Sequence, residues 1–67
     1  MDFVYTVMTK DGVLCVCRTK FTATNMVNNK AISQWGINPE TELKDFTGGV
    51  LYGWADKVWW EKQVLYD

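Results

Sequence analysis

The chain has 67 residues, a formal net charge of −1 and an aromatic content of 15%, with four tryptophans and no histidine. This length indicates one domain, residues 1–67, which buries only about 60% of the surface that the unfolded chain exposes. The small net charge disfavours nucleic acid as a partner, since phosphate backbones are bound by clustered basic residues. No apolar run approaches the roughly 20 residues that cross a bilayer, so no membrane partner is expected.

A strand hairpin is predicted at the start of the chain. β-Branched and aromatic residues fill positions 3–8 and 13–17, and Lys10-Asp11-Gly12 between them is typical of a tight turn. With an even number of residues in the loop, pairing across the hairpin puts one uncharged set of side chains toward the helix, whereas a bulged loop would break this assignment. The set expected to face the helix consists of Val4, Thr6, Met8, Val13, Cys15 and Cys17.

The two cysteines, Cys15 and Cys17, lie two residues apart on the second predicted strand. This separation suits a disulfide poorly, so we expect reduced, buried thiols, with pairing between two chains as the alternative. Reduced thiols, and a first strand that begins almost at Met1 with no signal peptide before it, favour a cytoplasmic location. A zinc site is disfavoured because histidine and a second cysteine pair are lacking, and no metal or cofactor is expected.

One main helix is expected after the hairpin, with Thr22 as its N-cap and Gly36 as its stop. Residues 38–40 (Asn-Pro-Glu) then predict a second cap that opens a short helical turn as far as about Leu43. The apolar residues that recur at helical spacing are Ala23, Met26, Val27, Ala31 and Trp35.

The last quarter of the chain has features of both strands and a helix. Residues 50–52 and 58–66 have the aromatic and β-branched density of strands, whereas Trp54, Val58 and Leu65 would also line one side of a helix. We favour the strands. The predicted fold is therefore α+β: a small antiparallel sheet of about four strands, in the order ββαββ, with one main helix packed on one face.

The chain is poorly supplied with catalytic groups. The absence of histidine removes the commonest general base near neutral pH. The thiols lack an activating cation on their own strand, because Arg18 next to Cys17 points to the opposite face. No catalytic residue is assigned, and we expect that the protein is not an enzyme.

The aromatic residues give the main indication of a binding surface. Trp59 and Trp60 point to opposite faces if they lie in a strand, so one of them faces outward or into a partner. If residues 55–56 form a two-residue turn, one face of the strands carries Tyr52, Trp54, Trp59 and Leu65, together with Glu61 and Gln63. Tryptophan and tyrosine are enriched where a few side chains dominate binding energy. The predicted interface residues are Tyr5, Tyr52, Trp54, Trp59 and Leu65.

These observations favour a small non-enzymatic protein–protein interaction module that acts by self-association as a homo-oligomer, by capture of a protein partner, or by both. Its size and tryptophan content are similar in style to phage-encoded inhibitors of host enzymes or defence systems, an analogy that involves no sequence match. The first alternative is a small-ligand or nucleotide-binding protein that stacks its ligand on the aromatic rings. The second is a single-stranded nucleic-acid binder, which Asp56 and Glu61 beside the tryptophans disfavour.

Overall fold

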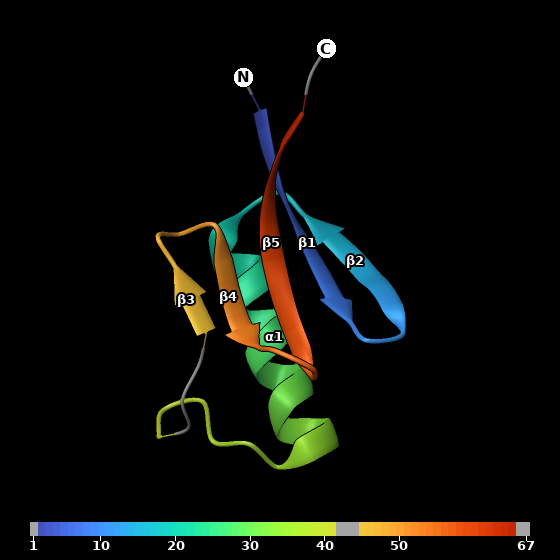
Figure 1. Ribbon diagram of the computed structural model, residues 1–67, viewed down its shortest axis with the longest axis vertical. Helices are drawn as coiled ribbons and strands as arrows, with labels where there is room; N and C mark the ends of the chain where they lie inside the picture. The colour runs from blue at the N-terminus through green and yellow to red at the C-terminus, as the bar shows by residue number, and fades with distance from the viewer. Residues whose placement is uncertain (1, 42–44, 66–67) are drawn as a thin grey trace.

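A computed structural model describes residues 2–41 and 45–65 of the chain. These residues form two layers, a five-stranded antiparallel sheet and a helix of 16 residues laid across one of its faces (Figure 1). The predicted α+β class, with one main helix packed on a small antiparallel sheet, is confirmed. The elements along the chain are β1 (Asp2–Thr9), β2 (Gly12–Cys17), α1 (Lys20–Trp35), β3 (Asp45–Thr47), β4 (Leu51–Trp54) and β5 (Val58–Leu65).

The strand order in the sheet is β2-β1-β5-β4-β3, so the first and last strands lie side by side in the middle. β1 and β5 have eight residues each and pair along their whole length. The four predicted strands are present, and a fifth, β3, joins them. β3 has only three residues, too few for a recognisable sequence pattern, and it pairs with β4 across a turn at Gly48 and Gly49, whose φ angles are 50° and 80°.

A bulge in the first hairpin decides which side chains face the helix. Val7 pairs with Cys15, but Met8 pairs with Val13, so Leu14 is an extra residue on β2. An extra residue reverses the alternation of side chains along one strand relative to its partner.

The predicted division of this hairpin into two faces is therefore wrong for β1 and right for the cysteines. Cys15 and Cys17 face the helix as expected, but they share that face with Val7 and Tyr5, their partners on β1. Four residues expected on the helix side lie on the opposite face instead: Val4, Thr6 and Met8 on β1, and Val13, the partner of Met8, on β2.

The helix starts one turn earlier than predicted. Thr19 is the N-cap, in an extended conformation (φ −122°), and its Oγ1 accepts a hydrogen bond from the Thr22 N–H (3.2 Å). Thr22, the predicted cap, lies in the first turn. The predicted stop is confirmed, because Gly36 takes a left-handed conformation (φ 66°) and its N–H donates to the carbonyl of Ile32 (3.0 Å).

Small residues on α1 bring the helix close to the sheet. Ala23, Val27 and Ala31 are fully buried and recur every four residues, as expected from the helical spacing. On the sheet side they meet Trp60, which is also fully buried, so the core lies between α1 and the middle strands. The remaining buried members of this core are Val7, Cys17, Trp54 and Val58.

After α1, Asn38 caps a turn, as predicted. Its Oδ1 accepts from the Glu40 N–H (3.0 Å), and its carbonyl accepts from the Thr41 N–H (3.1 Å). The predicted continuation to Leu43 lies outside the described residues, as does the predicted end of the last strand at Tyr66. In the last quarter the strand interpretation is confirmed by β4 and β5.

Candidate functional site

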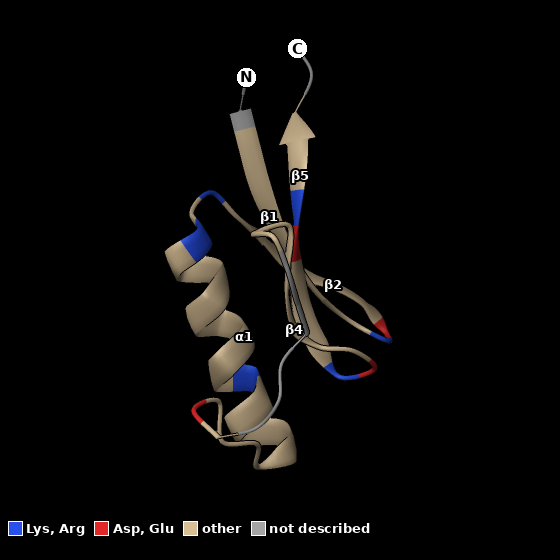
Figure 2. Cartoon of the chain, turned by 60° about the vertical axis from the view of Figure 1, so that its left-hand side comes forward, with Lys and Arg blue, Asp and Glu red and all other residues tan. Residues whose placement is uncertain are grey.

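The sheet has one face covered by α1 and one that no described element covers (Figure 2). We call the second surface the open face. Figure 2 shows charged residues at the two hairpin tips and in the middle of β5. Its apolar side chains include Val4, Met8, Val13, Val16, Leu51, Trp59 and Leu65, and its polar ones include Thr6, Glu61 and Gln63.

Trp59 lies on the open face near the start of β5, the middle strand of the sheet. It is half-buried, and its Nε1 donates a hydrogen bond to Glu61 Oε1 (3.1 Å). Its neighbour on β4 is Gly53, with φ 136°. A Cβ on Gly53 would lie 2.5 Å from Trp59 Cα, so only glycine permits this approach of the two strands.

A shallow hollow of about 300 Å³ adjoins Trp59 on this face. It is lined by Leu51, Ala55, Asp56, Trp59 and Glu61. The hollow therefore combines one aromatic ring and an aliphatic side chain with two carboxylates.

The other aromatic residues of the sheet belong to the helix side. The Trp60 ring contacts Tyr5 edge-to-face (centroids 5.0 Å apart) and stacks on Tyr52 (5.9 Å). Hydrogen bonds tie this cluster to α1, because Trp60 Nε1 donates to Thr24 Oγ1 (3.0 Å) and the Tyr52 hydroxyl donates to Asn28 Oδ1 (2.9 Å). These rings hold the two layers together.

The prediction that Tyr52, Trp54, Trp59 and Leu65 share one face is wrong. The turn between β4 and β5 has three residues, 55–57, rather than two, with Asp56 at φ 69°. Trp54 consequently pairs with Val58, and Tyr52 pairs with Trp60, on the helix side. Of the five predicted interface residues, Trp59 and Leu65 lie on the open face, and Tyr5, Tyr52 and Trp54 lie between the layers.

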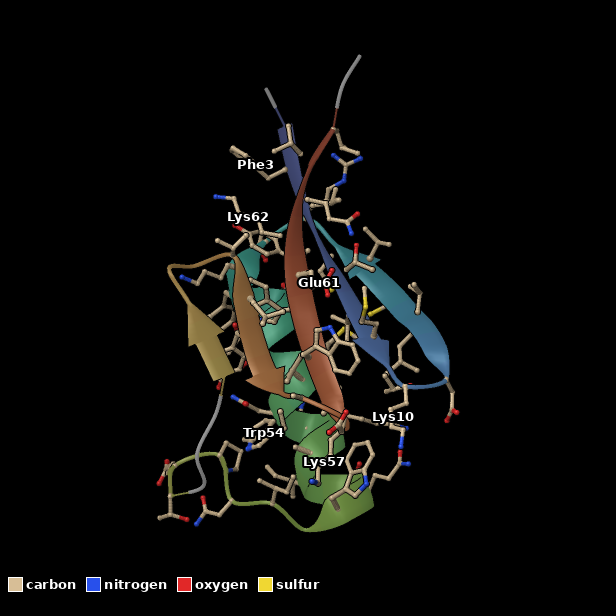
Figure 3. All side chains as sticks on the ribbon, viewed as in Figure 1. Phe3, Lys10, Trp54, Lys57, Glu61 and Lys62 are labelled. Atoms are coloured by element: carbon tan, nitrogen blue, oxygen red, sulfur yellow. The ribbon has the colours of Figure 1, made fainter. Side chains whose placement is uncertain are left out.

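The expected division between the two adjacent tryptophans is confirmed. Trp60 is fully buried in the core and Trp59 is half-buried on the open face. Trp54 is 7% exposed, and its Nε1 is buried without a hydrogen-bond partner in the described part of the chain. Figure 3 shows Trp54 near the lower end of the sheet.

The upper end of the sheet carries a separate exposed aromatic residue. Phe3 on β1 is 41% exposed, and Lys62 Nζ lies 4.1 Å from the centre of its ring, a cation–π contact (Figure 3). The contact joins the two middle strands of the sheet.

A second hollow, of about 440 Å³, lies between the hairpin tips and the end of α1. Its charged lining has both signs, with Lys10, Lys30 and Lys57 opposed by Asp11 and Asp56. This mixture favours neither an anion nor a cation as a ligand.

Three sulfur atoms meet between β2 and α1. Cys15 Sγ and Cys17 Sγ are 3.9 Å apart, and Met26 Sδ lies 3.4 Å from the first and 3.6 Å from the second. Burial raises the pKa of the Cys15 thiol, and the hydrogen bond and charge interaction with Cys17 raise it further. Sequence analysis placed all three residues toward the core but did not bring them together.

The described residues contain neither a group of three cysteine or acidic side chains suited to a metal ion nor a membrane-spanning helix. Within 2–41 and 45–65, no three cysteine or acidic side chains converge in a way that could hold a metal ion. In the same part of the chain, no helix has the length and apolar character needed to cross a membrane.

Comparison with known proteins gives no match, since no family model, curated protein or solved structure corresponds to this chain. The class of protein is thus defined by its architecture, a two-layer α+β domain with one uncovered sheet face. Its function has to be argued from its own surfaces.

Proposed function

We propose that this protein is a non-enzymatic protein–protein interaction module, and that a protein partner covers its open face. The observation that carries the proposal is the one-sided cover of the sheet, with α1 on one face and apolar side chains around Trp59 on the other. Small monomeric domains rarely leave such a face uncovered, because contiguous exposed apolar surface is typical of interaction sites.

Trp59 is suited to the centre of such an interface. Tryptophan is enriched among residues that dominate binding energy, especially near the middle of a contact. The hydrogen bond to Glu61 and the close approach of Gly53 hold the region around Trp59 in place before any partner arrives. A preformed anchor loses less side-chain freedom on binding, and this favours affinity.

The charge on the open face favours a partner that is not a second copy of this chain. Glu61 presents a carboxylate on the open face, and it lies on the middle strand. A symmetric face-to-face dimer would bring the two Glu61 carboxylates together near its axis, which disfavours that dimer. We therefore propose a partner with an apolar surface that places a lysine or arginine against Glu61.

More specifically, we propose that the protein acts in the cytoplasm and inhibits a host enzyme or defence system, as phage-encoded inhibitors do. Covering a functional surface of another protein requires no catalytic group from the inhibitor. The support is the absence of histidine in a chain of 67 residues, together with the aromatic open face.

The test compares variants on the open face with one on the opposite side of the molecule. A partner captured from a lysate by the wild-type chain is purified, and its binding is measured by calorimetry for Trp59→Ala, Glu61→Lys and Phe21→Ala. Phe21 is 76% exposed on α1, so its variant controls for general loss of surface. We expect Trp59→Ala to weaken binding at least about 30-fold, corresponding to the roughly 2 kcal/mol of a dominant contact, and Phe21→Ala to change it little.

Two results would contradict the proposal. The first is unchanged partner binding by Trp59→Ala and Glu61→Lys chains that unfold cooperatively. The second is a wild-type dimer in sedimentation velocity that Trp59→Ala dissociates, which would make a second copy the occupant of the open face.

The hollow beside Trp59 favours a second candidate, the binding of a small molecule. Its volume of about 300 Å³ is at the lower limit for ligand sites, about 300–1,000 Å³. Asp56 and Glu61 in its lining disfavour phosphate groups, so the ligand would be uncharged or cationic rather than a nucleotide or single-stranded nucleic acid. A ligand at 100 times its dissociation constant would stabilise the fold by about 2.7 kcal/mol, measurable as a thermal shift.

A further inference from the structure

The three sulfur atoms between β2 and α1 form a compact triangle. Its sides are 3.9 Å between Cys15 and Cys17, 3.4 Å between Cys15 and Met26, and 3.6 Å between Cys17 and Met26. A point equidistant from all three atoms lies about 2.1 Å from each, close to the roughly 2.3 Å bond between sulfur ligands and a d¹⁰ metal ion such as Zn²⁺. The cluster thus has the dimensions of a three-coordinate metal site.

The backbone fixes two of the three ligands. Cys15 and Cys17 are alternate residues of β2 and point to the same face, where the bulge at Leu14 aligns them with Val7 and Tyr5. Met26 comes from α1, and its flexible thioether reaches over both thiols. Two elements that are packed together by the core therefore supply the three sulfurs.

The donor set selects the kind of metal ion. Thiolate and thioether sulfur are soft ligands, which favour Cu(I), whereas Zn²⁺ in structural sites takes four ligands in a tetrahedron. Mg²⁺ and Ca²⁺ need oxygen ligands, and no carboxylate contacts this cluster in the described part of the chain. From the three sulfurs and their separations, we infer that Cys15, Cys17 and Met26 bind one Cu(I) ion.

An incoming ion can reach the site from the exposed side of Met26 on α1. Met26 is 40% exposed and Cys15 is half-buried, whereas Cys17 is 7% exposed and forms the inner wall. An ion can first meet the thioether and then the two thiols, without separation of the sheet from the helix. This inference is independent of the proposed interaction module, because the cluster and the open face lie on opposite sides of the sheet.

Binding of Cu(I) requires neither an oxidant nor a reductant. The two thiols release two protons, two Cu–thiolate bonds and one Cu–thioether bond form, and copper remains Cu(I). The bound site carries one net negative charge, from two thiolates and one monovalent cation.

The experiment titrates the reduced full-length chain with Cu(I), supplied as its acetonitrile complex without oxygen, against a coloured Cu(I) chelator. Native mass spectrometry is expected to show one copper per chain, and X-ray absorption to show three sulfur neighbours at about 2.3 Å. Loss of an outer-shell partner typically costs 10–100-fold in metal affinity, so loss of a direct ligand in Met26→Leu or Cys17→Ser should cost at least about tenfold.

Met8→Leu is the matched control for Met26→Leu. Met8 lies on the other face of the sheet, and leucine conserves the volume of methionine well enough that both variants should fold. The Met26 variant should retain two sulfur neighbours and the Met8 variant three. Any of four results would overturn the inference. The two methionine variants could bind Cu(I) with equal affinity, or copper could be bound between two chains. Cys15→Ser could leave Cu(I) binding unaltered, or the wild-type chain could fail to compete with the chelator.

Discussion

Replacement of each core tryptophan by phenylalanine tests how the two indole N–H groups are accommodated. Trp54→Phe and Trp60→Phe remove the same atoms from buried positions, since the two residues are 7% and 0% exposed. They differ in hydrogen bonding, because Trp60 Nε1 donates to Thr24 whereas Trp54 Nε1 is buried without a described partner. We therefore expect Trp60→Phe to be the more destabilising change.

The difference follows from the cost of each group. Trp60→Phe loses a hydrogen bond with a net value of about 0.5–1.5 kcal/mol, and Trp54→Phe removes an unsatisfied donor whose burial costs about 1–3 kcal/mol. The two free energies of unfolding should therefore differ by about 2–4 kcal/mol. A domain of 67 residues has a total of about 3–10 kcal/mol, so Trp60→Phe becomes marginally stable while Trp54→Phe stays close to the wild type.

Urea unfolding followed by far-ultraviolet circular dichroism measures this difference without relying on tryptophan emission. With a slope of about 1–2 kcal/mol per molar urea, the midpoints should differ by about 1–4 M. The reasoning is refuted if Trp54→Phe is as destabilising as Trp60→Phe. That result would mean that the Trp54 N–H has a partner and that its removal costs a hydrogen bond.

Two further predictions concern the backbone. Gly53→Ala should lower the melting temperature much more than Gly12→Ala. Both glycines have positive φ (136° and 132°), but of the two only Gly53 would place an added Cβ against backbone atoms, at 2.5 Å. Equal losses of melting temperature in calorimetry would contradict the close approach of β4 to β5. Thr19→Ala should destabilise the fold by about 1 kcal/mol through loss of the N-cap, and Thr22→Ala by less. If Thr22→Ala lowered the free energy of unfolding in urea more than Thr19→Ala, Thr22 would be the N-cap, as the sequence predicted.

The elements of this fold were predictable from composition and periodicity. Turn residues at Lys10-Asp11-Gly12, helical spacing from Ala23 to Ala31 and the aromatic density after Val58 are local signals, and each predicted its element correctly. The helix stop at Gly36 was equally predictable because it depends on one backbone conformation.

The faces of the strands were not predictable in the same way. One extra residue reverses the side-chain alternation of a strand relative to its partner, and this happened at Leu14 in the first hairpin and in the three-residue turn at 55–57 in the last. Both lengths are set by how strands twist and pair, which a single sequence does not display. Of the predicted interface residues, Trp59 and Leu65 therefore lie on the open face, whereas Tyr5, Tyr52 and Trp54 pack in or against the core.

The sulfur cluster shows the remaining gap between sequence and structure. Sequence reasoning placed Cys15, Cys17 and Met26 toward the core. Their meeting depends on how far α1 is shifted along the sheet, which is fixed by the small residues Ala23 and Ala31 and by the bonds from Trp60 and Tyr52 to the helix.

The central pairing of β1 with β5 has a consequence for how the chain folds during synthesis. These strands hold residues 2–9 and 58–65, so the middle of the sheet joins the segments of the described chain that are farthest apart in sequence. Contacts of this kind slow folding because a long loop must close first. On the ribosome, β1, β2 and α1 emerge while the place of β5 beside β1 is still vacant. Until residue 65 has left the exit tunnel, the edge of β1 is exposed to other nascent chains and to chaperones.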